Sequence, residues 1–168
     1  MAKKRLSTKA TYVERGYGQV EPNHLSAQRT AQIYAQLPAA SNIDVLENGQ
    51  YVKYNYADGV VDFAGEGEWM LVFNEVKIYD DRNVINDFAM IKGDEVIVPR
   101  VFKTNVGDIY TTNTIAETEL EIGDELVVGD DGYLTKTAGT NAGAMKWQVV
   151  KVYTMPDMQK GVKIMRIA

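Results

Sequence analysis

The chain contains no cysteine, one histidine (His24) and three serines (Ser7, Ser26 and Ser41). The absence of cysteine excludes disulfide scaffolds, thiolate zinc sites, iron–sulfur clusters and cysteine nucleophiles. A single histidine excludes any metal centre built on several histidines. A serine–histidine triad would have to be assembled around the N-terminal region that holds His24. These shortages remove much of ordinary enzyme chemistry before any motif is considered.

Long apolar runs are missing too, since no segment approaches the roughly 18 apolar residues that indicate a membrane-spanning helix. The start of the chain, Met1-Ala2-Lys3-Lys4-Arg5, is basic, but no apolar core follows it as it would in a secretory signal. We therefore expect no membrane contact. We also expect a protein that is made in a cytoplasm and stays there or in a particle assembled there.

The chain has 168 residues, with 45% hydrophobic and 24% charged residues, which is the composition of an ordinary globular domain. Its 23 acidic and 18 basic residues give a net charge of −5, which disfavours a dedicated nucleic-acid binder. The charge is unevenly divided. Residues 1–40 carry six basic and two acidic side chains, a balance of +4, and residues 41–168 have a balance of −9.

Residues 1–40 have few large aliphatic side chains and cannot build a core alone. Gly16-Tyr17-Gly18 is typical of a turn or flexible piece. Ser26 can cap a short helix near residues 26–37, and Pro38 would end it. Two interpretations of residues 1–40 remain: a partly disordered terminus, and an arm that becomes ordered against a partner. The arm is favoured because its tyrosines and aliphatic residues are costly to leave in water.

Residues 41–168 have the pattern of a β-rich body. Short segments rich in valine, isoleucine, tyrosine and threonine alternate with turn residues, without a long helix between them. The candidate strands are Tyr51–Tyr56, Val60–Phe63, Trp69–Tyr79, Glu95–Phe102, Ile109–Thr112, Glu125–Val128, Tyr133–Lys136, Met145–Tyr153 and Val162–Ile167. The turns are Asn48-Gly49, Asp58-Gly59, Lys92-Gly93-Asp94, Val106-Gly107-Asp108, Ile122-Gly123-Asp124 and Asp131-Gly132. The fold class predicted is mainly β, a small antiparallel β-barrel or sandwich preceded by the extended arm.

An internal repeat relates Leu46–Tyr79 to Leu120–Tyr153. Both windows begin with Leu-Glu-x-Gly, contain an Asp-Gly turn and an Ala-Gly pair, and end in Val-Lys-x-Tyr. The offset between matched positions is 74 residues, except at the Asp-Gly turn, where it is 73. The repeat predicts two similar hairpin units, each covering the apolar face of the other.

Acidic residues offer the remaining candidates for catalysis or metal binding. The oxygen-rich stretch Asp80–Asp87 lacks the spacing of a calcium loop, so a solvated loop is expected. Asp130-Asp131 and Asp124-Glu125 are sequence neighbours, and neighbours on a strand point to opposite faces, which disfavours a catalytic pair. His24 lies outside any predicted rigid pocket. We therefore predict no enzyme activity, no catalytic residue, no cofactor and no metal.

Aromatic residues are frequent, with ten tyrosines and two tryptophans. Trp69 and Trp147 stand in apolar segments, so packing in a core or a subunit interface is expected rather than a stacking platform. An exposed patch around Tyr51, Tyr54 and Tyr56 is the alternative, and it would indicate a carbohydrate-binding β module. The basic start supports only a weak, salt-sensitive contact with nucleic acid, and no specific nucleic-acid partner is expected.

Three features occur together: the arm from Gly16 to Ala39, Gly-Asp turns that lead into short strands at Val106–Asn113 and Leu120–Gly132, and the lack of cysteines, catalytic histidines and cofactor motifs. In this arrangement the chain resembles the accessory head proteins of tailed bacteriophages, the decoration or cement proteins. The resemblance implies a structural virion protein on the outer surface of the capsid, bound to the major capsid protein and stabilising the shell. It also implies a homo-oligomer, with a trimer favoured, and an arm that joins the shell.

Carried onto this chain, the resemblance makes residues 1–40 the anchor and residues 41–168 the body. Aromatic and aliphatic side chains would supply buried area, and arginines would supply directed hydrogen bonds. The candidate capsid-binding residues are Tyr12, Arg15, Tyr17, Arg29, Ile33, Tyr34 and Leu37. Another virion part, such as a head-fibre base or a tail component, remains an alternative function.

Overall fold

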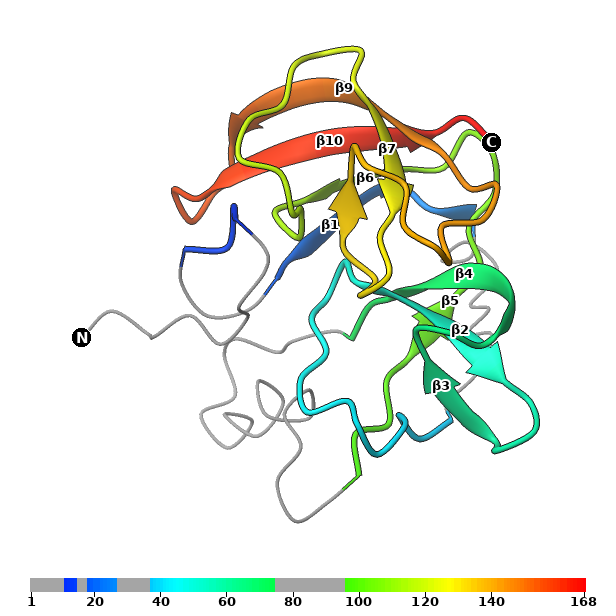
Figure 1. The fold of residues 1–168 in the computed structure, drawn as a ribbon. Coiled ribbons are helices and arrows are strands. Elements are labelled where there is room, and N and C mark those ends of the chain that lie inside the picture. The colour runs from blue at the N-terminus through cyan, green and yellow to red at the C-terminus, as the bar shows by residue number, and fades with distance from the viewer. Residues whose placement is uncertain (1–10, 15–17, 27–36, 75–95) are drawn as a thin grey trace.

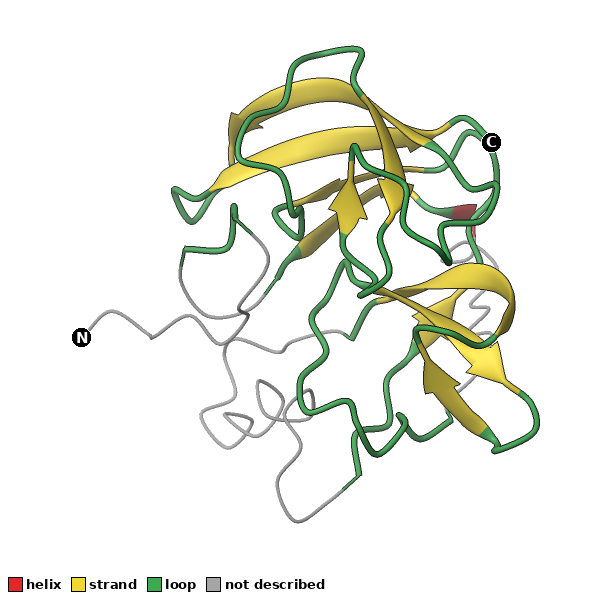
Figure 2. Cartoon of the chain, viewed as in Figure 1, coloured by secondary structure: helices red, strands yellow, loops and turns green. Residues whose placement is uncertain are grey.

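The computed structural model describes residues 11–14, 18–26, 37–74 and 96–168. Nearly all of the described chain is strand or loop, as Figure 2 shows, which confirms the expectation of a mainly β protein. The helix expected near residues 26–37 falls, apart from its two ends, outside the described residues. The same holds for the loop expected at Asp80–Asp87.

The described strands form two antiparallel sheets (Figure 1). The six-stranded sheet has the order β1-β6-β10-β9-β7-β8 and curls into a half-barrel, and the four-stranded sheet has the order β3-β2-β4-β5. The bounds of the strands are β1 Val20–His24, β2 Tyr51–Asn55, β3 Val60–Asp62, β4 Glu66–Val72, β5 Val101–Phe102, β6 Ile109–Thr112, β7 Glu125–Val128, β8 Leu134–Thr135, β9 Trp147–Thr154 and β10 Lys160–Arg166.

Several strand predictions differ from the structure in their limits. Strands β6 and β7 match the prediction to the residue. Of the segment predicted as Glu95–Phe102, the described part 96–102 is strand at Val101–Phe102, and Pro99, just before it, has no N–H to give to a ladder. The strand predicted from Trp69 begins earlier, at Glu66, and is described to Val72. Strand β1 was not predicted at all.

The main core lies between the two sheets. It combines residues of the four-stranded sheet with residues of the six-stranded sheet. Its members are Tyr12, Leu25, Tyr51, Trp69, Leu71, Tyr110, Ile115, Leu120, Leu126, Val128, Leu134, Met145, Trp147, Val149, Val162 and Ile164. Tyr110 meets Trp147 edge to face with ring centroids 5.1 Å apart, a favourable aromatic geometry. The prediction that Trp69 and Trp147 are core residues is confirmed, because neither side chain is exposed by more than 1%.

The four-stranded sheet is buried on its other face as well. Val52, Met70 and Val72 pack there with Ile43, Leu46 and Ile97 in a second core. Burial on both faces explains why β4 contains four consecutive buried residues instead of an alternating pattern. This sheet is therefore an internal layer of the molecule.

Within the described residues, one turn geometry occurs three times. In each copy the fourth residue donates its N–H to the carbonyl of the first, at 3.0–3.2 Å. The N–H of the first residue donates to a side-chain oxygen of the fourth, at 2.8–3.0 Å. The third residue is a glycine with φ between 91° and 98°, which side chains disfavour. The three copies are Glu47–Gln50, Asn105–Asp108 and Glu121–Asp124.

Each of these turns also starts a strand and fixes its register. The glycine N–H and the carbonyl of the fourth residue bond to one and the same residue of a neighbouring strand. That residue is Val72 of β4 for the first turn, Arg166 of β10 for the second and Val149 of β9 for the third. The turns expected at Asn48-Gly49, Val106-Gly107-Asp108 and Ile122-Gly123-Asp124 are thus confirmed, and each also pairs strands that are far apart in the sequence.

The strand pairings of the two predicted repeat units are alike. In the first unit β2 pairs with β3 and β4, and in the second β7 pairs with β8 and β9. The register of the third strand of each unit, β4 or β9, however, differs from the one that the sequence repeat predicts. Equivalent hydrogen bonds equate Val72 with Val149, an offset of 77 residues, whereas the matched Val-Lys-x-Tyr segments differ by 74.

Candidate partner-binding region

The N-terminal residues that the structure describes are bound to the β body at successive points. Thr11 donates its N–H to the carbonyl of Ile115 at 2.8 Å. Tyr12 is only 4% exposed and belongs to the main core, and burial raises the pKa of its phenol. Val13 is fully buried against Tyr133. Residues 11–13 are therefore part of the folded unit.

The turn between β9 and β10 contacts the same N-terminal segment, which lies beside it in Figure 1. The Glu14 N–H donates to Oε1 of Gln159 at 2.8 Å. On the far side of residues 15–17, Nε2 of Gln19 donates to Oδ2 of Asp157 at 2.5 Å. The Lys160 ammonium lies 5.9 Å from the centroid of the Tyr12 ring. This turn thus contacts Glu14 and Gln19, which precede and follow residues 15–18 in the chain.

Gly18 occupies a site that admits no side chain. A Cβ at this position would lie 2.1 Å from Oγ1 of Thr114 and 2.5 Å from the Asn48 carbonyl. Its N–H donates to Oε1 of the fully buried Glu47 at 3.1 Å. The other oxygen of Glu47 accepts from the Tyr133 hydroxyl at 2.8 Å. A buried carboxylate with these donors fixes the N-terminal segment against the turn that starts β2.

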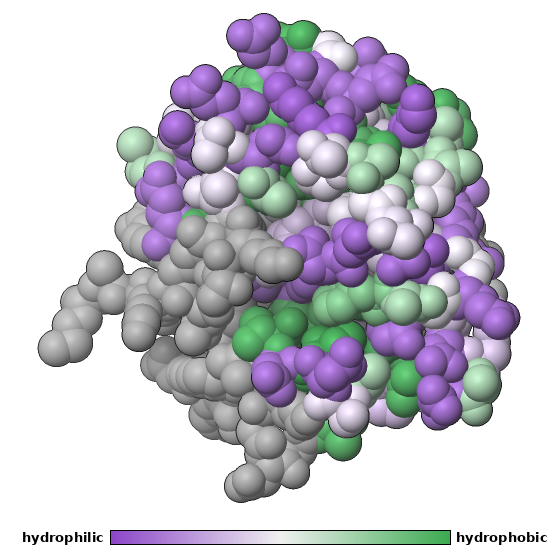
Figure 3. Space-filling model, in the orientation of Figure 1, coloured by the Kyte–Doolittle hydropathy of each residue, from purple (hydrophilic) through white to green (hydrophobic). Residues whose placement is uncertain are grey.

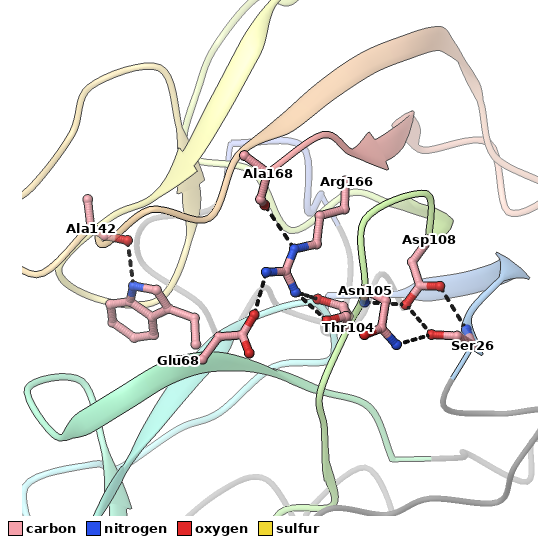
Figure 4. Close-up of polar contacts among 9 residues, drawn as sticks. Ser26, Glu68, Thr104, Asn105, Asp108, Ala142, Arg166 and Ala168 are labelled. Atoms are coloured by element: carbon pink, nitrogen blue, oxygen red, sulfur yellow. Dashed lines mark hydrogen bonds and ion pairs between the residues drawn. The ribbon is translucent and has the colours of Figure 1, made fainter.

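Strand β1 then forms one edge of the six-stranded sheet, paired with β6 from Val20 to His24. The chain leaves this strand at Ser26, whose N–H and hydroxyl donate to the two carboxylate oxygens of Asp108 at 2.8 and 2.9 Å (Figure 4). Asn105 completes the cluster by donating from its amide to the Ser26 hydroxyl at 2.7 Å. Ser26 is thereby held at the point where the described chain stops.

After residues 27–36 the described chain resumes at the four-stranded sheet. Leu37 packs against the second core. The Pro38 carbonyl accepts from the Val61 N–H, and the Ala40 N–H donates to the Val61 carbonyl, each at 2.9 Å. The Ala39 N–H donates to the Ile97 carbonyl at 2.8 Å. Residues 37–40 therefore bind alongside β3.

The candidate capsid-binding residues thus divide into two groups. Tyr12 and Leu37 pack against the cores, so their side chains are engaged within the chain itself. The other candidates lie outside the described residues and are Arg15, Tyr17, Arg29, Ile33 and Tyr34. The stretches 15–17 and 27–36 are each bracketed by residues that bind the body. The sequence does not predict the contacts of Gly18, Glu47 and Asp108, because no local signal marks a partner that is distant in the chain.

A second polar network joins the two sheets (Figure 4). Arg166 of β10 forms an ion pair with Glu68 of β4 and donates to the carbonyl of Thr104. Its Nε donates to the Ala168 carbonyl at 2.9 Å. On the same strand β4, Nε1 of Trp69 donates to the Ala142 carbonyl at 2.8 Å. These contacts fix the position of one sheet on the other and leave the guanidinium only 11% exposed.

The acidic side chains that the sequence analysis considered for catalysis accept hydrogen bonds within loops or form surface ion pairs. Asp130 accepts from the N–H groups of Asn141 and Thr140, which lowers the pKa of its carboxyl. The Glu121 N–H, and then Lys136 at 2.7 Å, lower the pKa of Asp124. Glu125 pairs with Lys146. Among the described residues, no three His, Asp or Glu side chains form a group that could hold a metal ion.

His24 and the tyrosines of the proposed aromatic patch occupy different environments. His24 lies exposed on β1 opposite Ile109. Tyr56 is 63% exposed and stacks on Tyr54, with ring centroids 5.0 Å apart and planes inclined by 17°. Tyr51 is fully buried, and it faces the main core while Tyr54 faces the second core. An exposed patch of three tyrosines is therefore not formed, because Tyr51 and Tyr54 point to opposite faces of β2 and both faces of this sheet are covered.

The visible surface is mainly hydrophilic over the six-stranded sheet (Figure 3). Hydrophobic atoms gather in the lower half of this view. Within the part of the chain that the structure describes, there is no helix with the length and apolar character that crossing a bilayer requires. Comparison of the chain with protein-family models, curated proteins and solved structures found no match.

Proposed function

We propose that the chain is a non-enzymatic structural protein of a tailed-phage virion, located on the outer surface of the capsid. It decorates and stabilises the shell by binding the major capsid protein through residues of its N-terminal segment. The observation that carries this proposal is the uneven charge, +4 over residues 1–40 against −9 over residues 41–168, with the remaining candidate contacts in the stretches 15–17 and 27–36. These stretches contain Arg15, Tyr17, Arg29, Ile33 and Tyr34.

The distribution of charge has a physical advantage for such a contact. The +4 balance of residues 1–40 suits an acidic partner surface, and the −9 balance of the remainder keeps separate copies soluble. On a lattice with many identical sites, modest individual contacts sum to a large stabilisation.

The proposal includes two finer features. One is an internal duplication, supported by the matching strand pairings of the two units and by their identical turns at Glu47–Gln50 and Glu121–Asp124. The other is a homo-oligomer, with a trimer favoured, which places several N-terminal segments on one lattice site. Both serve a protein whose task is binding.

Co-sedimentation with mature, empty capsids of the source phage tests the function. The intact chain should bind saturably, near one copy per lattice site. Arg15→Glu and Arg29→Glu should weaken binding, since each reverses a charge in a bracketed stretch. Lys151→Glu is the matched control, because it reverses an exposed charge on β9 of the six-stranded sheet and should bind as the intact chain does. Absence of binding by the intact chain would overturn the proposal.

Each of the two alternative functions has its own test. A head-fibre base or tail component would be present at few copies per particle, which quantitative mass spectrometry of virions distinguishes from a decoration protein. A carbohydrate-binding module would use the exposed Tyr56 stacked on Tyr54. Binding to a glycan array that Tyr56→Ala abolishes would favour that second function.

A further inference from the structure

The methionines that the structure describes differ widely in their exposure to solvent. Met70, Met145 and Met155 are buried, with exposed fractions of 1%, 3% and 3%. Met165 on β10 is half-buried. Met158 is 76% exposed, the largest fraction among the exposed large hydrophobic residues of the described chain. Of the described methionines, Met158 is therefore the one whose side chain is most open to solvent.

Met158 lies in the tight turn between β9 and β10, at one end of the six-stranded sheet (Figure 1). Its N–H donates to the Met155 carbonyl at 2.9 Å, and the Met155 N–H donates to the Gln159 carbonyl at 2.7 Å. The backbone of Met158 is left-handed, with φ of 70°, which strains a residue that has a Cβ. Because its side chain lies in solvent, Met158 adds little packing to offset this strain. Its thioether therefore contributes little to the stability of the fold.

Met155, three residues earlier in the same turn, has the opposite environment. A Cβ added to Gly161 would lie 2.5 Å from the Met155 Cγ and 2.7 Å from its Sδ, so the thioether packs directly against the Gly161 backbone. Gln159 is buried beside it in the turn, and the Oε1 of Gln159 accepts from the Glu14 N–H. The Met155 sulfur is thus enclosed, and an oxygen added to it must displace neighbouring atoms.

Exposure decides which thioether a small oxidant reaches in a folded protein. With hydrogen peroxide, the sulfur lone pair attacks one oxygen, so an S–O bond forms and the O–O bond breaks. The sulfur loses two electrons. The second oxygen leaves as hydroxide and takes the proton of the transferred oxygen, which gives water. The product, methionine sulfoxide, has a polar oxygen that costs little in solvent and disrupts packing in a core.

We propose that Met158 is a modification site, oxidised to the sulfoxide by peroxides in the folded protein, while burial protects Met155 in the same turn. Oxidation of Met155 or Met70 requires the fold to open first, and only a small fraction of molecules is open at any time. The protein keeps its fold after oxidation of Met158, because the added oxygen lies in solvent. A thiol-dependent methionine sulfoxide reductase reverses the step. This chemistry is independent of the proposed binding to capsids.

A time course of the intact chain in hydrogen peroxide, followed by mass spectrometry of its peptides, tests the proposal. The peptide signal of Met158 should gain one oxygen at least about tenfold faster than those of Met155 and Met70. Treatment with the reductase and a thiol should remove that oxygen. Oxidation of Met155 or Met70 at the same rate as Met158 would overturn the proposal.

The variants Met158→Gln and Met155→Gln form a matched pair, since glutamine resembles methionine sulfoxide in length and polarity. In urea denaturation, Met158→Gln should keep the midpoint of the intact chain, and Met155→Gln should lower it or prevent folding. A lower midpoint for Met158→Gln would show that this side chain supports the fold, and an unchanged midpoint for Met155→Gln would show that its packing does not. Either result would overturn the assignment of the two methionines.

Discussion

The hydroxyl groups of Tyr51 and Tyr110 lie 2.7 Å apart in the centre of the protein, and each is the polar end of a fully buried side chain. Tyr51 comes from β2 of the four-stranded sheet and Tyr110 from β6 of the six-stranded sheet. Both rings also contact Trp147. One hydrogen bond therefore connects the two layers through the core.

Removing both of these hydroxyls should cost less than the sum of the two single removals. Tyr51→Phe or Tyr110→Phe leaves the other hydroxyl buried without its partner, which costs about 1–3 kcal/mol of unfolding free energy. The double variant leaves no unpaired hydroxyl, so its loss should be smaller than the sum of the single losses. Urea denaturation of the four proteins measures this coupling. Additive losses would show that the two hydroxyls do not stabilise the fold through their shared hydrogen bond.

The same pair predicts a loss of stability in alkali. Burial raises the pKa of both Tyr51 and Tyr110 above the ordinary value of 10.0. The folded protein therefore keeps both protons at a pH where the unfolded chain has released them. The contribution is complete below pH 10, and above it the unfolding free energy should fall by about 1.4 kcal/mol per pH unit for each tyrosine.

Denaturation of the intact chain and of the Tyr51→Phe/Tyr110→Phe variant, at a series of alkaline pH values, tests this pH dependence. The intact chain should show the steeper decline. Equal slopes in the two proteins would mean that other groups, such as Tyr12 and Tyr153, dominate the alkaline response, since burial raises their pKa values as well.

Gly18→Ala should loosen the N-terminal segment. The added Cβ meets Thr114 and the Asn48 carbonyl at distances that real contacts do not reach, so the segment must shift and lose its bond to Glu47. The cost expected for such overpacking is about 1–3 kcal/mol. Amide hydrogen exchange at residues 18–24 should accelerate. Gly59→Ala, where a Cβ has open space, is the control and should leave exchange in this segment unchanged.

Arg166 and Glu68 should contribute unequally although they form one ion pair. Arg166→Met removes the donor to Thr104 and Ala168 as well as the charge, which should cost about 2 kcal/mol because the Thr104 carbonyl loses its partner. Glu68→Gln should cost less than about 1 kcal/mol, since the Glu68 side chain is 37% exposed and solvent screens its charge. Urea denaturation ranks the two, and an equal cost would contradict the assignment.

Truncations should distinguish residues 1–10 from residues 1–40. Deletion of residues 1–40 removes Tyr12, Val13 and Leu25 from the cores, at about 1.5–3 kcal/mol each. Because a whole domain is stable by only about 5–15 kcal/mol, this variant should not fold. Deletion of residues 1–10 keeps every contact described above and should unfold cooperatively, as circular dichroism would show. A folded chain lacking residues 1–40 would contradict the structure.

The sequence predicted the body well wherever a local signal existed. A Gly-Asp turn directly before an apolar run located β6 and β7 to the residue, because the turn geometry depends on the glycine and on its neighbours alone. Strand β1 carried no such signal, since it contains Pro22 and polar residues and is stabilised by pairing with β6. Its place in the sheet is a tertiary effect that local propensity does not express.

The candidate site was harder to predict for the same reason. Tyr12 and Leu37 have the composition expected of partner contacts, and only the fold shows that the body itself covers them. Glu47 looks like a surface residue in the sequence, yet it is buried, because its partners Gly18 and Tyr133 come from 29 and 86 positions away. Long-range hydrogen bonds of this kind leave no periodicity to detect.

The strand order has a consequence for synthesis of the protein. Every strand of the four-stranded sheet lies between residues 51 and 102, whereas the six-stranded sheet takes strands from residue 20 to residue 166. In this sheet β10 lies between β6 and β9, although it is the last described strand in the sequence. A ribosome therefore delivers the whole inner layer long before the outer layer can close. Until β10 emerges, β1 and β6 have no link to β9, and the nascent chain exposes the apolar face on which the two layers later meet.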